Sequence, residues 1–427
     1  MSTAAGTAPP RATAGARRAG AALRHRNFRL FFFGQLVSLI GTWMQSLAQG
    51  WLVLQLTQDP FVLGVISAVQ YLPMMVFGLF GGLIADALPK RATLVGTQTA
   101  SMLLALALFW LSWTHQVQAW HIGVLALLLG IVNTVDMPTR QAFVVEMVGR
   151  DDVVNAVALN SAVFNVARIL GPAVAGVIIG LVGIASCFFL NGVSYIAVIA
   201  GLLAMRSSEL HAKGGYQFTR SASAVLRDLG EGLRYVRSTP VVLLAVGVVG
   251  LVSTLGMNLN VLVPVYTADV LHTNATGFGF LMAATGIGSL VAALTIAVIG
   301  RSSPRVMLAG GAALGLLQLA LVAVHAMPVA LACMFGIGFG SIAMTATANT
   351  SIQLAVPDSL RGRVLSVYTT VFAGSTPVGA LFAGTLAAQW GAALAFGAGG
   401  AASAAVVAVA FALARPWMAR QAVARAA

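Results

Sequence analysis

Long apolar stretches, each of about 20 residues, repeat along almost the whole chain. Only 8% of the 427 residues are charged, whereas an average soluble protein has about 25%. An exterior with so little charge faces a lipid bilayer rather than water. We therefore predict an all-α membrane protein with twelve transmembrane helices, at residues 30–56, 61–85, 92–114, 120–140, 155–180, 183–205, 241–268, 277–299, 306–325, 328–355, 364–388 and 391–415.

The twelve predicted helices form two groups of six. A shift of 208 positions aligns Gly171 with Gly379 and Gly176 with Gly384, so the two halves are pseudo-repeats. Residues 222–237, in the basic segment between the halves, have the pattern of a short amphipathic surface helix. The predicted organisation is a disordered cytoplasmic tail at 1–29, a six-helix bundle at 30–205, a cytoplasmic linker at 206–240, a second six-helix bundle at 241–415 and a cytoplasmic tail at 416–427.

The Lys and Arg residues fall on one side of the predicted membrane. If the N-terminus lies inside, 22 of the 24 are in cytoplasmic segments and none is in an outer loop, which is the positive-inside pattern. The two exceptions are Arg140, at the cytoplasmic rim of span four, and Arg168, deep in span five. We therefore place both termini in the cytoplasm. The alanine- and arginine-rich composition is typical of GC-rich bacterial DNA and favours a bacterial inner membrane.

The sequence also argues against several other classes of protein. The cations lie between apolar runs rather than on one soluble face, which argues against nucleic-acid binding. Cys187 and Cys333 both lie inside apolar runs and indicate neither a disulfide framework nor a metal site. The sequence shows no phosphate-binding glycine loop, nucleophile–base pair or metal-ligand cluster. We therefore expect neither an enzyme nor a bound cofactor.

Polar side chains inside an apolar span are costly, so they face a cavity or another helix. Span one carries such residues along one face at helical spacing, and spans five, seven and ten carry further sets. Both alternatives, cavity lining and helix–helix contact, are open for these residues. Taking the first, the predicted substrate cavity comprises Gln35, Ser38, Thr42, Gln45, Gln49, Ser161, Asn165, Arg168, Asn258, Ser341, Thr345 and Asn349.

Two charged residues within the spans have specific alternatives. Arg168 requires an anion, carbonyl groups or water at its depth. It is either a structural contact to polar residues of span one or four, or a functional group, as an anchor for an acidic substrate or as one member of a switchable ion pair. Asp136 is the only acid well inside an apolar span, which makes it the candidate for proton coupling. It also precedes Arg140 by four residues, a spacing that allows a plain ion pair within one helix.

The connection between spans two and three resembles a loop motif of the major facilitator superfamily, and the matching residues are Gly82, Asp86, Lys90 and Arg91. Ala87 stands where that family usually has a basic residue, and Pro89 where it has glycine. The resemblance implies that Asp86 locks the cytoplasmic side by contacting the start of span eleven. Arg361 and Arg363 precede that helix and would supply cations beside its N-terminus.

Two further likenesses narrow the family. The Gly171-Pro172 pair with Gly176 resembles an element of span five in antiporters of the superfamily, where proline kinks the helix and glycine allows close packing. Residues 23–56, 136–142 and 361–364 resemble the enterobactin-exporter and macrolide-efflux branch. This likeness implies export of a bulky, partly apolar organic molecule, driven by the proton gradient.

The function predicted from sequence is therefore secondary active export of siderophore- or drug-like molecules by alternating access. The expected partners are a small organic substrate, protons and the lipid bilayer, with a monomer as the functional unit. The alternatives are an uptake carrier or lysolipid-type flippase of the same fold, and, from another class, a non-transporting receptor or scaffold. The predicted gating and coupling residues are Gly82, Asp86, Lys90, Arg91, Asp136, Arg140, Gly171, Pro172, Gly176, Arg361 and Arg363.

Overall fold

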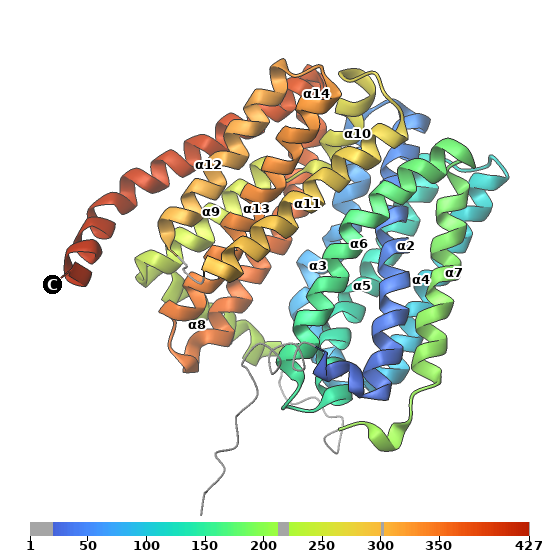
Figure 1. Cartoon of the computed structure of the whole chain (residues 1–427), viewed down its shortest axis with the longest axis horizontal. Coiled ribbons are helices and arrows are strands. Elements are labelled where there is room, and N and C mark those ends of the chain that lie inside the picture. Colours follow the sequence, from blue (N-terminus) through green and yellow to red (C-terminus); the bar gives the residue numbers. More distant parts are fainter. Residues whose placement is uncertain (1–19, 212–221, 300–302, 427) are drawn as a thin grey trace, which may run out of the picture.

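The computed structural model describes residues 20–211, 222–299 and 303–426, and the side chains of Leu79, Asp86, Ala222 and 416–426 lie outside that description. All its regular elements over these residues are helices, arranged in two bundles side by side (Figure 1). The first bundle contains α2 (Arg26–Thr57), α3 (Pro60–Ala87), α4 (Lys90–Trp113), α5 (Ala119–Val148), α6 (Val153–Leu181) and α7 (Ala185–Leu203). The second contains α9 (Pro240–Gly256), α10 (Leu259–Asp269), α11 (Ala275–Ile299), α12 (Pro304–Ala320), α13 (Met327–Ala355) and α14 (Asp358–Ala426).

Local sequence explains where the helices turn. Gln58 adopts a left-handed conformation after α2, and the Asp59 side chain accepts a hydrogen bond from the Phe61 amide at the start of α3, which opens with Pro60. Gly391 has a φ of 82° and divides α14 into two spans. Eleven segments of the described chain are long and apolar enough to cross a membrane, with α9 and α10 together as one of them. Counting α14 twice confirms the predicted twelve spans.

The segments flanking the spans differ in part from the predicted tails and linker. Residues 1–19 lie outside the description, but residues 21–24 form a 3-10 helix, η1 (Ala21–Arg24), and α2 begins at Arg26 rather than at residue 30. The predicted amphipathic helix is confirmed as α8 (Ala222–Ser238). Helix α14 continues to Ala426, past the residue 415 at which we ended the second bundle. Two further 3-10 helices are η2 (Ser207–Glu209) and η3 (Leu321–Ala323).

The contacts of four glycines bear out the relation between the halves. Gly171 of α6 packs against the backbone of α2, and a Cβ there would lie 2.9 Å from the Ile40 carbonyl oxygen. Its counterpart Gly379 packs in the same way against the end of α9. Gly176 faces α11 and its counterpart Gly384 faces α3, each across the boundary between halves. The shift of 208 positions thus pairs residues with equivalent packing roles, as small residues at helix crossings allow.

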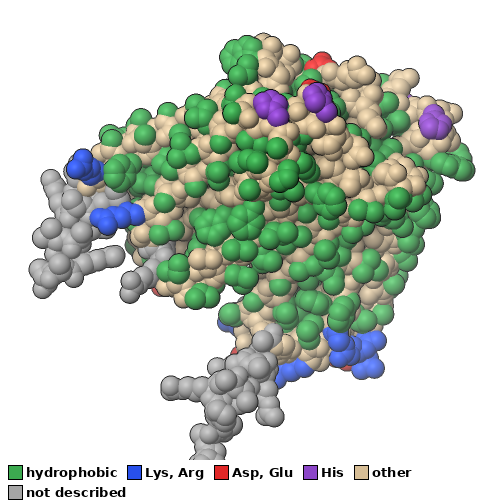
Figure 2. Space-filling view, turned by 45° about the horizontal axis from the view of Figure 1, so that its top comes forward, with side chains coloured by type: hydrophobic (Ala, Val, Ile, Leu, Met, Phe, Trp, Pro, Cys, Tyr) green, Lys and Arg blue, Asp and Glu red, His purple; other side chains and the backbone are tan. Residues whose placement is uncertain are grey.

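The halves touch at one end of the molecule and separate toward the other (Figure 1). The end that separates carries the Lys and Arg side chains, and exposed histidines lie at the opposite end (Figure 2). We call these the basic end and the opposite end. Along α6 and α11, close glycine contacts run from the opposite end as far as Arg168 and Gly286, and along α3 and α14 as far as Met75 and Gly374. The space-filling view shows a recess between the halves at the basic end (Figure 2), so the structure is open at that end.

A larger side chain at position 64 is expected to separate the two halves at the opposite end. A Cβ on Gly64 would lie 2.6 Å from the Ala380 carbonyl oxygen, so Gly64→Leu overpacks this crossing by about 1–3 kcal/mol and shifts the equilibrium roughly 5- to 150-fold toward an open opposite end. Spin labels at Gln116 and Ala326 should then report a longer distance. Gly96→Leu is the control, because a Cβ at Gly96 meets no heavy atom within 4 Å. Unchanged distances in Gly64→Leu would show that this crossing does not hold the end closed.

Candidate functional site

Arg168 lies near the middle of α6, where the contact between the halves ends. Its guanidinium carbon is 5.9 Å from the ring centroid of Trp43 on α2, and its side chain is only partly buried. No described carboxylate pairs with it. A guanidinium group on an aromatic face is favourably placed, but the ring does not provide hydrogen-bond acceptors for all five N–H donors. Among the described residues, Arg168 thus has an aromatic neighbour but no carboxylate partner.

Ser161 and Asn165 continue the face of Arg168 toward the basic end. Ser161 is exposed, and Asn165 donates to the Ser161 carbonyl oxygen at 2.8 Å. Phe164, between them, packs on Trp43 with 5.6 Å between ring centroids. Ser161, Asn165 and Arg168 therefore follow one another at helical spacing along α6, and their place in a substrate cavity stays a prediction.

The polar residues along one face of span one, which we call the polar stripe, mostly form contacts within the first half. Gln35 accepts from Arg140 of α5 at 2.7 Å, Gln45 accepts from Asn191 of α7 at 2.6 Å, and Gln49 donates to Gln70 of α3 at 3.0 Å. Ser38 is buried as well, and Thr42 is half-buried. In this conformation the stripe mainly joins α2 to its neighbours, which was the alternative to cavity lining.

A small cavity with several polar residues lies where α2, α3 and α10 meet. It has a volume of about 20 Å³ and draws residues from both halves, which none of the single-helix patterns indicated. That volume accommodates about one water molecule. The polar residues are Ser46, Gln49, Ser67, Gln70, Tyr71 and Asn260. Gln70 and Tyr71 interrupt an apolar span, a signal that would have identified them in the sequence.

The second half contributes a break in span seven that the sequence analysis did not predict. Helix α9 ends at Gly256 and α10 begins at Leu259, with Asn258 between them. Gln318 of α12 donates to the Gly256 carbonyl oxygen, which the break leaves without a helical partner. Interrupted membrane helices present backbone groups inside the protein, where polar ligands are bound. The break therefore adds a candidate site element.

The remaining predicted residues of the second half lie on α13. Ser341 is buried with its hydroxyl 3.7 Å from the Met257 sulfur, at the break. Thr345 is half-buried and donates to the Ser341 carbonyl oxygen at 2.9 Å. Asn349 accepts from Gln353 at 2.6 Å, nearer the basic end. Ser341 is thus the predicted α13 residue brought closest to the interrupted helix.

Asp136 sits in a buried polar cluster rather than at the opening. Its carboxylate accepts from Thr97 at 2.7 Å and from Gln98 at 2.8 Å, both on α4, and it forms an ion pair with Arg140. The same-helix ion pair is therefore present. Because Arg140 also donates to Gln35, the cluster joins α2, α4 and α5.

The predicted gating residues hold the first half together at the basic end. Lys90 forms an ion pair with Glu146 at 2.7 Å, and Arg91 donates to the Leu202 and Leu203 carbonyl oxygens at 2.7 and 2.9 Å. Gly82 has open space where a Cβ would stand. The Asp86 side chain lies outside the described residues, so its gating role stays a prediction.

The start of α6 and the start of α14 are each held by the segment that precedes their own bundle. Arg24, the last residue of η1, and His25, which follows it, both form hydrogen bonds with the Asp152 carboxylate at 2.7 Å. In the second half the charges are reversed: Arg363 pairs with Asp228 at 3.0 Å and with Glu231, both on α8. Arg361 pairs with Asp358 of its own helix at 2.5 Å. We call the contacts of Asp152 with Arg24 and His25 the first clasp, and the contacts of Arg363 with Asp228 and Glu231 the second clasp.

The first clasp is expected to depend on the charge of Asp152. Its hydrogen bonds with His25 and then Arg24 lower the pKa of this carboxyl group. A lowered folded pKa means that the stabilisation is complete above the unfolded value of about 3.9 and is lost as the pH falls through the lower folded value. Asp152→Asn should therefore release η1 at neutral pH, seen as several-fold faster hydrogen exchange over residues 20–25. Equal exchange in variant and wild type would contradict this; Asp151→Asn is the matched control.

Comparison with known proteins supports a transporter. A model of the family described as transmembrane secretion effector matches residues 18–426. The multidrug efflux pump Tap of Mycolicibacterium fortuitum is 30% identical over 373 residues, covering 84% of this chain and 88% of that protein. The staphyloferrin A transporter of Staphylococcus aureus is 26% identical over 365 residues, covering 83% and 87%.

A solved structure supports the fold. The nucleoside transporter NupG superposes with a TM-score of 0.71 at 12% identity, covering 91% of this chain and 98% of that chain. Identity at this level bears on the fold alone. Together with the sequence matches, it confirms the predicted resemblance to major facilitator transporters.

Proposed function

This chain belongs to the transmembrane secretion effector family of the major facilitator superfamily, and from that premise we propose that it exports a bulky organic anion from the bacterial cytoplasm. It is a multi-pass membrane transporter and not an enzyme. The export direction, the substrate and the energy source are our proposals. The observation that carries them is Arg168, a partly buried cation with no described acidic partner at the limit of an opening.

The charge distribution supports the proposed orientation. The open end is the basic end (Figure 2), and segments rich in Lys and Arg stay in the cytoplasm of bacteria. We therefore propose that both termini are cytoplasmic and that this conformation takes up its substrate from the cytoplasm. The opening lies between the two halves of one chain, so a monomer suffices for transport.

The surroundings of Arg168 support the proposed substrate class. A carboxylate or similar anion would supply the acceptors that the guanidinium lacks, while Trp43 and Phe164 offer an apolar surface beside it. A molecule with acidic groups and an apolar body fits both. Relatives named as a multidrug efflux pump and a staphyloferrin A transporter are compatible with such cargo.

The cluster around Asp136 supports proton coupling as the proposed energy source. Protonation of Asp136 would remove the charge that holds Arg140 and would loosen the contact of α5 with α2 through Gln35. A proton taken up there would therefore act on helix positions rather than on the substrate directly.

The test uses inside-out membrane vesicles with the overproduced protein. Vesicles are given a panel of hydroxycarboxylate siderophores and fluorescent drugs of either charge, with and without a protonophore. We expect accumulation of anionic compounds that stops when the proton gradient collapses, and none in vesicles lacking the protein. Accumulation only in right-side-out vesicles would favour the uptake carrier. Transport of cations alone would overturn the anionic substrate class.

A further inference from the structure

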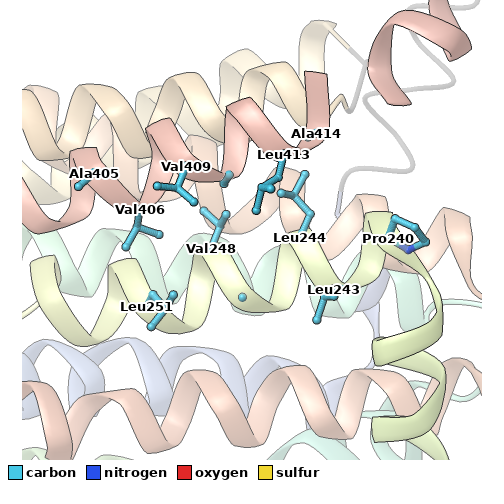
Figure 3. Close-up of a pocket in the computed structure, with 12 residues that line it drawn as sticks. Pro240, Leu243, Leu244, Val248, Leu251, Ala405, Val406, Val409, Leu413 and Ala414 are labelled. Atoms are coloured by element: carbon cyan, nitrogen blue, oxygen red, sulfur yellow. The ribbon is translucent and has the colours of Figure 1, made fainter. Parts of the chain in front are cut away.

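A long apolar groove lies between α9 and the last span of α14 (Figure 3). Its volume is about 580 Å³. The lining residues are Pro240, Leu243, Leu244, Gly247, Val248, Leu251, Ala405, Val406, Val409, Ala410, Leu413 and Ala414. None of these side chains is polar, so the groove suits hydrocarbon and nothing that needs a hydrogen bond.

The equivalent helices of the first half are in close contact at two glycines. There α2 and α7 pack closely: a Cβ on Gly34 would lie 3.0 Å from the Val198 Cα, and one on Gly201 would lie 3.1 Å from the Leu30 carbonyl oxygen. In the second half, a Cβ on Gly247 would meet no heavy atom within 4 Å. The groove is thus a departure from the repeat, where a packed crossing has opened.

The length of the groove matches one leaflet of a bilayer. It runs from Pro240 to Leu251 along α9, which is about 17 Å at 1.5 Å per residue, and half of a hydrocarbon core is about 15 Å. Figure 3 shows Pro240 and Ala414 at one end of it and Leu251 and Ala405 at the other. An acyl chain lying along the groove would therefore remain within a single leaflet.

The charged residues near one end of the groove indicate which kind of lipid headgroup would bind there. Ala414 is followed by the exposed Arg415, and Pro240 is preceded by the exposed Arg237 at the end of α8. The acids of α8, Asp228 and Glu231, already pair with Arg363. Two arginines at the membrane surface attract an anionic headgroup rather than a neutral one.

We propose that this groove is a binding site for one anionic phospholipid of the leaflet at the basic end. One acyl chain lies between α9 and α14, and the phosphate contacts Arg237 and Arg415. The lipid fills the space that the open crossing would otherwise leave, and so holds the last span against the bundle. This site lies outside the proposed substrate path.

The test counts retained lipids by native mass spectrometry on the purified full-length protein, with phosphatidylglycerol or phosphatidylcholine added. Two arginines should favour phosphatidylglycerol about 30-fold. Gly247→Phe fills the groove and should abolish the retained molecule, whereas Gly247→Ala should keep it. Arg237→Gln with Arg415→Gln should reduce phosphatidylglycerol to the level of phosphatidylcholine, and Arg305→Gln is the charge control.

Two results would overturn the proposal. One is equal retention of both lipids by the wild type, which would mean general surrounding lipid. The other is unchanged phosphatidylglycerol retention in Gly247→Phe. Monodisperse elution of each variant on size-exclusion chromatography verifies folding, and because a Cβ at Gly247 has open space, this substitution is not expected to disturb packing.

Discussion

Replacing Arg168 by glutamine is expected to weaken transport of an anionic substrate by about 10- to 150-fold in apparent affinity. The estimate follows from the 1.5–3 kcal/mol that hydrogen bonds to charged groups contribute. Glutamine keeps most of the side-chain length and some donors but removes the charge. Since Arg168 has no described acidic partner, its loss leaves no buried anion behind, and folding should be little affected.

The charge dependence distinguishes an anchor from a structural contact. Arg168→Lys retains the charge but not the planar fork, so it should keep part of the activity. Trp43→Leu removes the aromatic face and should reduce affinity less than the loss of charge. The measurement is the concentration dependence of uptake into inside-out vesicles. If Arg168→Gln transports the anion with wild-type affinity, or loses neutral substrates equally, the anchor assignment is wrong.

Replacing Asp136 by asparagine is expected to destabilise the first half by about 3 kcal/mol, the lower part of the range for a broken buried ion pair. Asp136 is almost fully buried, and 21% of the Arg140 side chain is exposed. Asparagine would face Arg140 with an amide and leave the guanidinium without its counter-charge. Thermal unfolding in detergent, followed by loss of monodisperse protein, measures the effect.

A double variant separates the ion pair from other roles of Asp136. Asp136→Asn combined with Arg140→Gln removes both charges and should recover much of the lost stability. If the single variant is as stable as the wild type, the pair contributes nothing and our reading of the cluster fails. If the double variant is stable yet its transport no longer responds to a protonophore, Asp136 takes part in coupling rather than in folding alone.

The predicted helices and the predicted site were recovered to different extents. The apolar runs located every span, because each run is buried in lipid independently of the others. Some helices extend beyond their predicted spans at the basic end, as α5 does by eight residues to Val148. The amphipathic helix α8 followed from the spacing of its charged residues for the same local reason. The break between α9 and α10 was missed, since Met257 and Asn258 carry no proline signal and the freed carbonyl is satisfied by Gln318, a residue far along the chain.

The polar residues of span one show why the site was harder to predict. Their helical spacing places Gln35, Gln45 and Gln49 on one face of α2. The spacing does not indicate which other helices, or which cavity, that face contacts. Their partners Arg140, Asn191 and Gln70 lie on three other helices. Arg168 was singled out by the cost of a charged side chain in a membrane, whereas its contact with Trp43 was found only in the folded chain.

The sequence by itself determined that this chain spans a membrane twelve times, with its cations on one side and its halves related by repeat. These properties depend on the free energy of transferring each segment from water to lipid. That free energy is a sum of contributions from residues that are neighbours in the sequence. Only the tertiary structure decided that the basic end is open, that the span-one glutamines serve neighbouring helices, and that α9 and α14 leave a groove. These features depend on contacts between residues far apart in the chain, which the pattern within one helix does not specify.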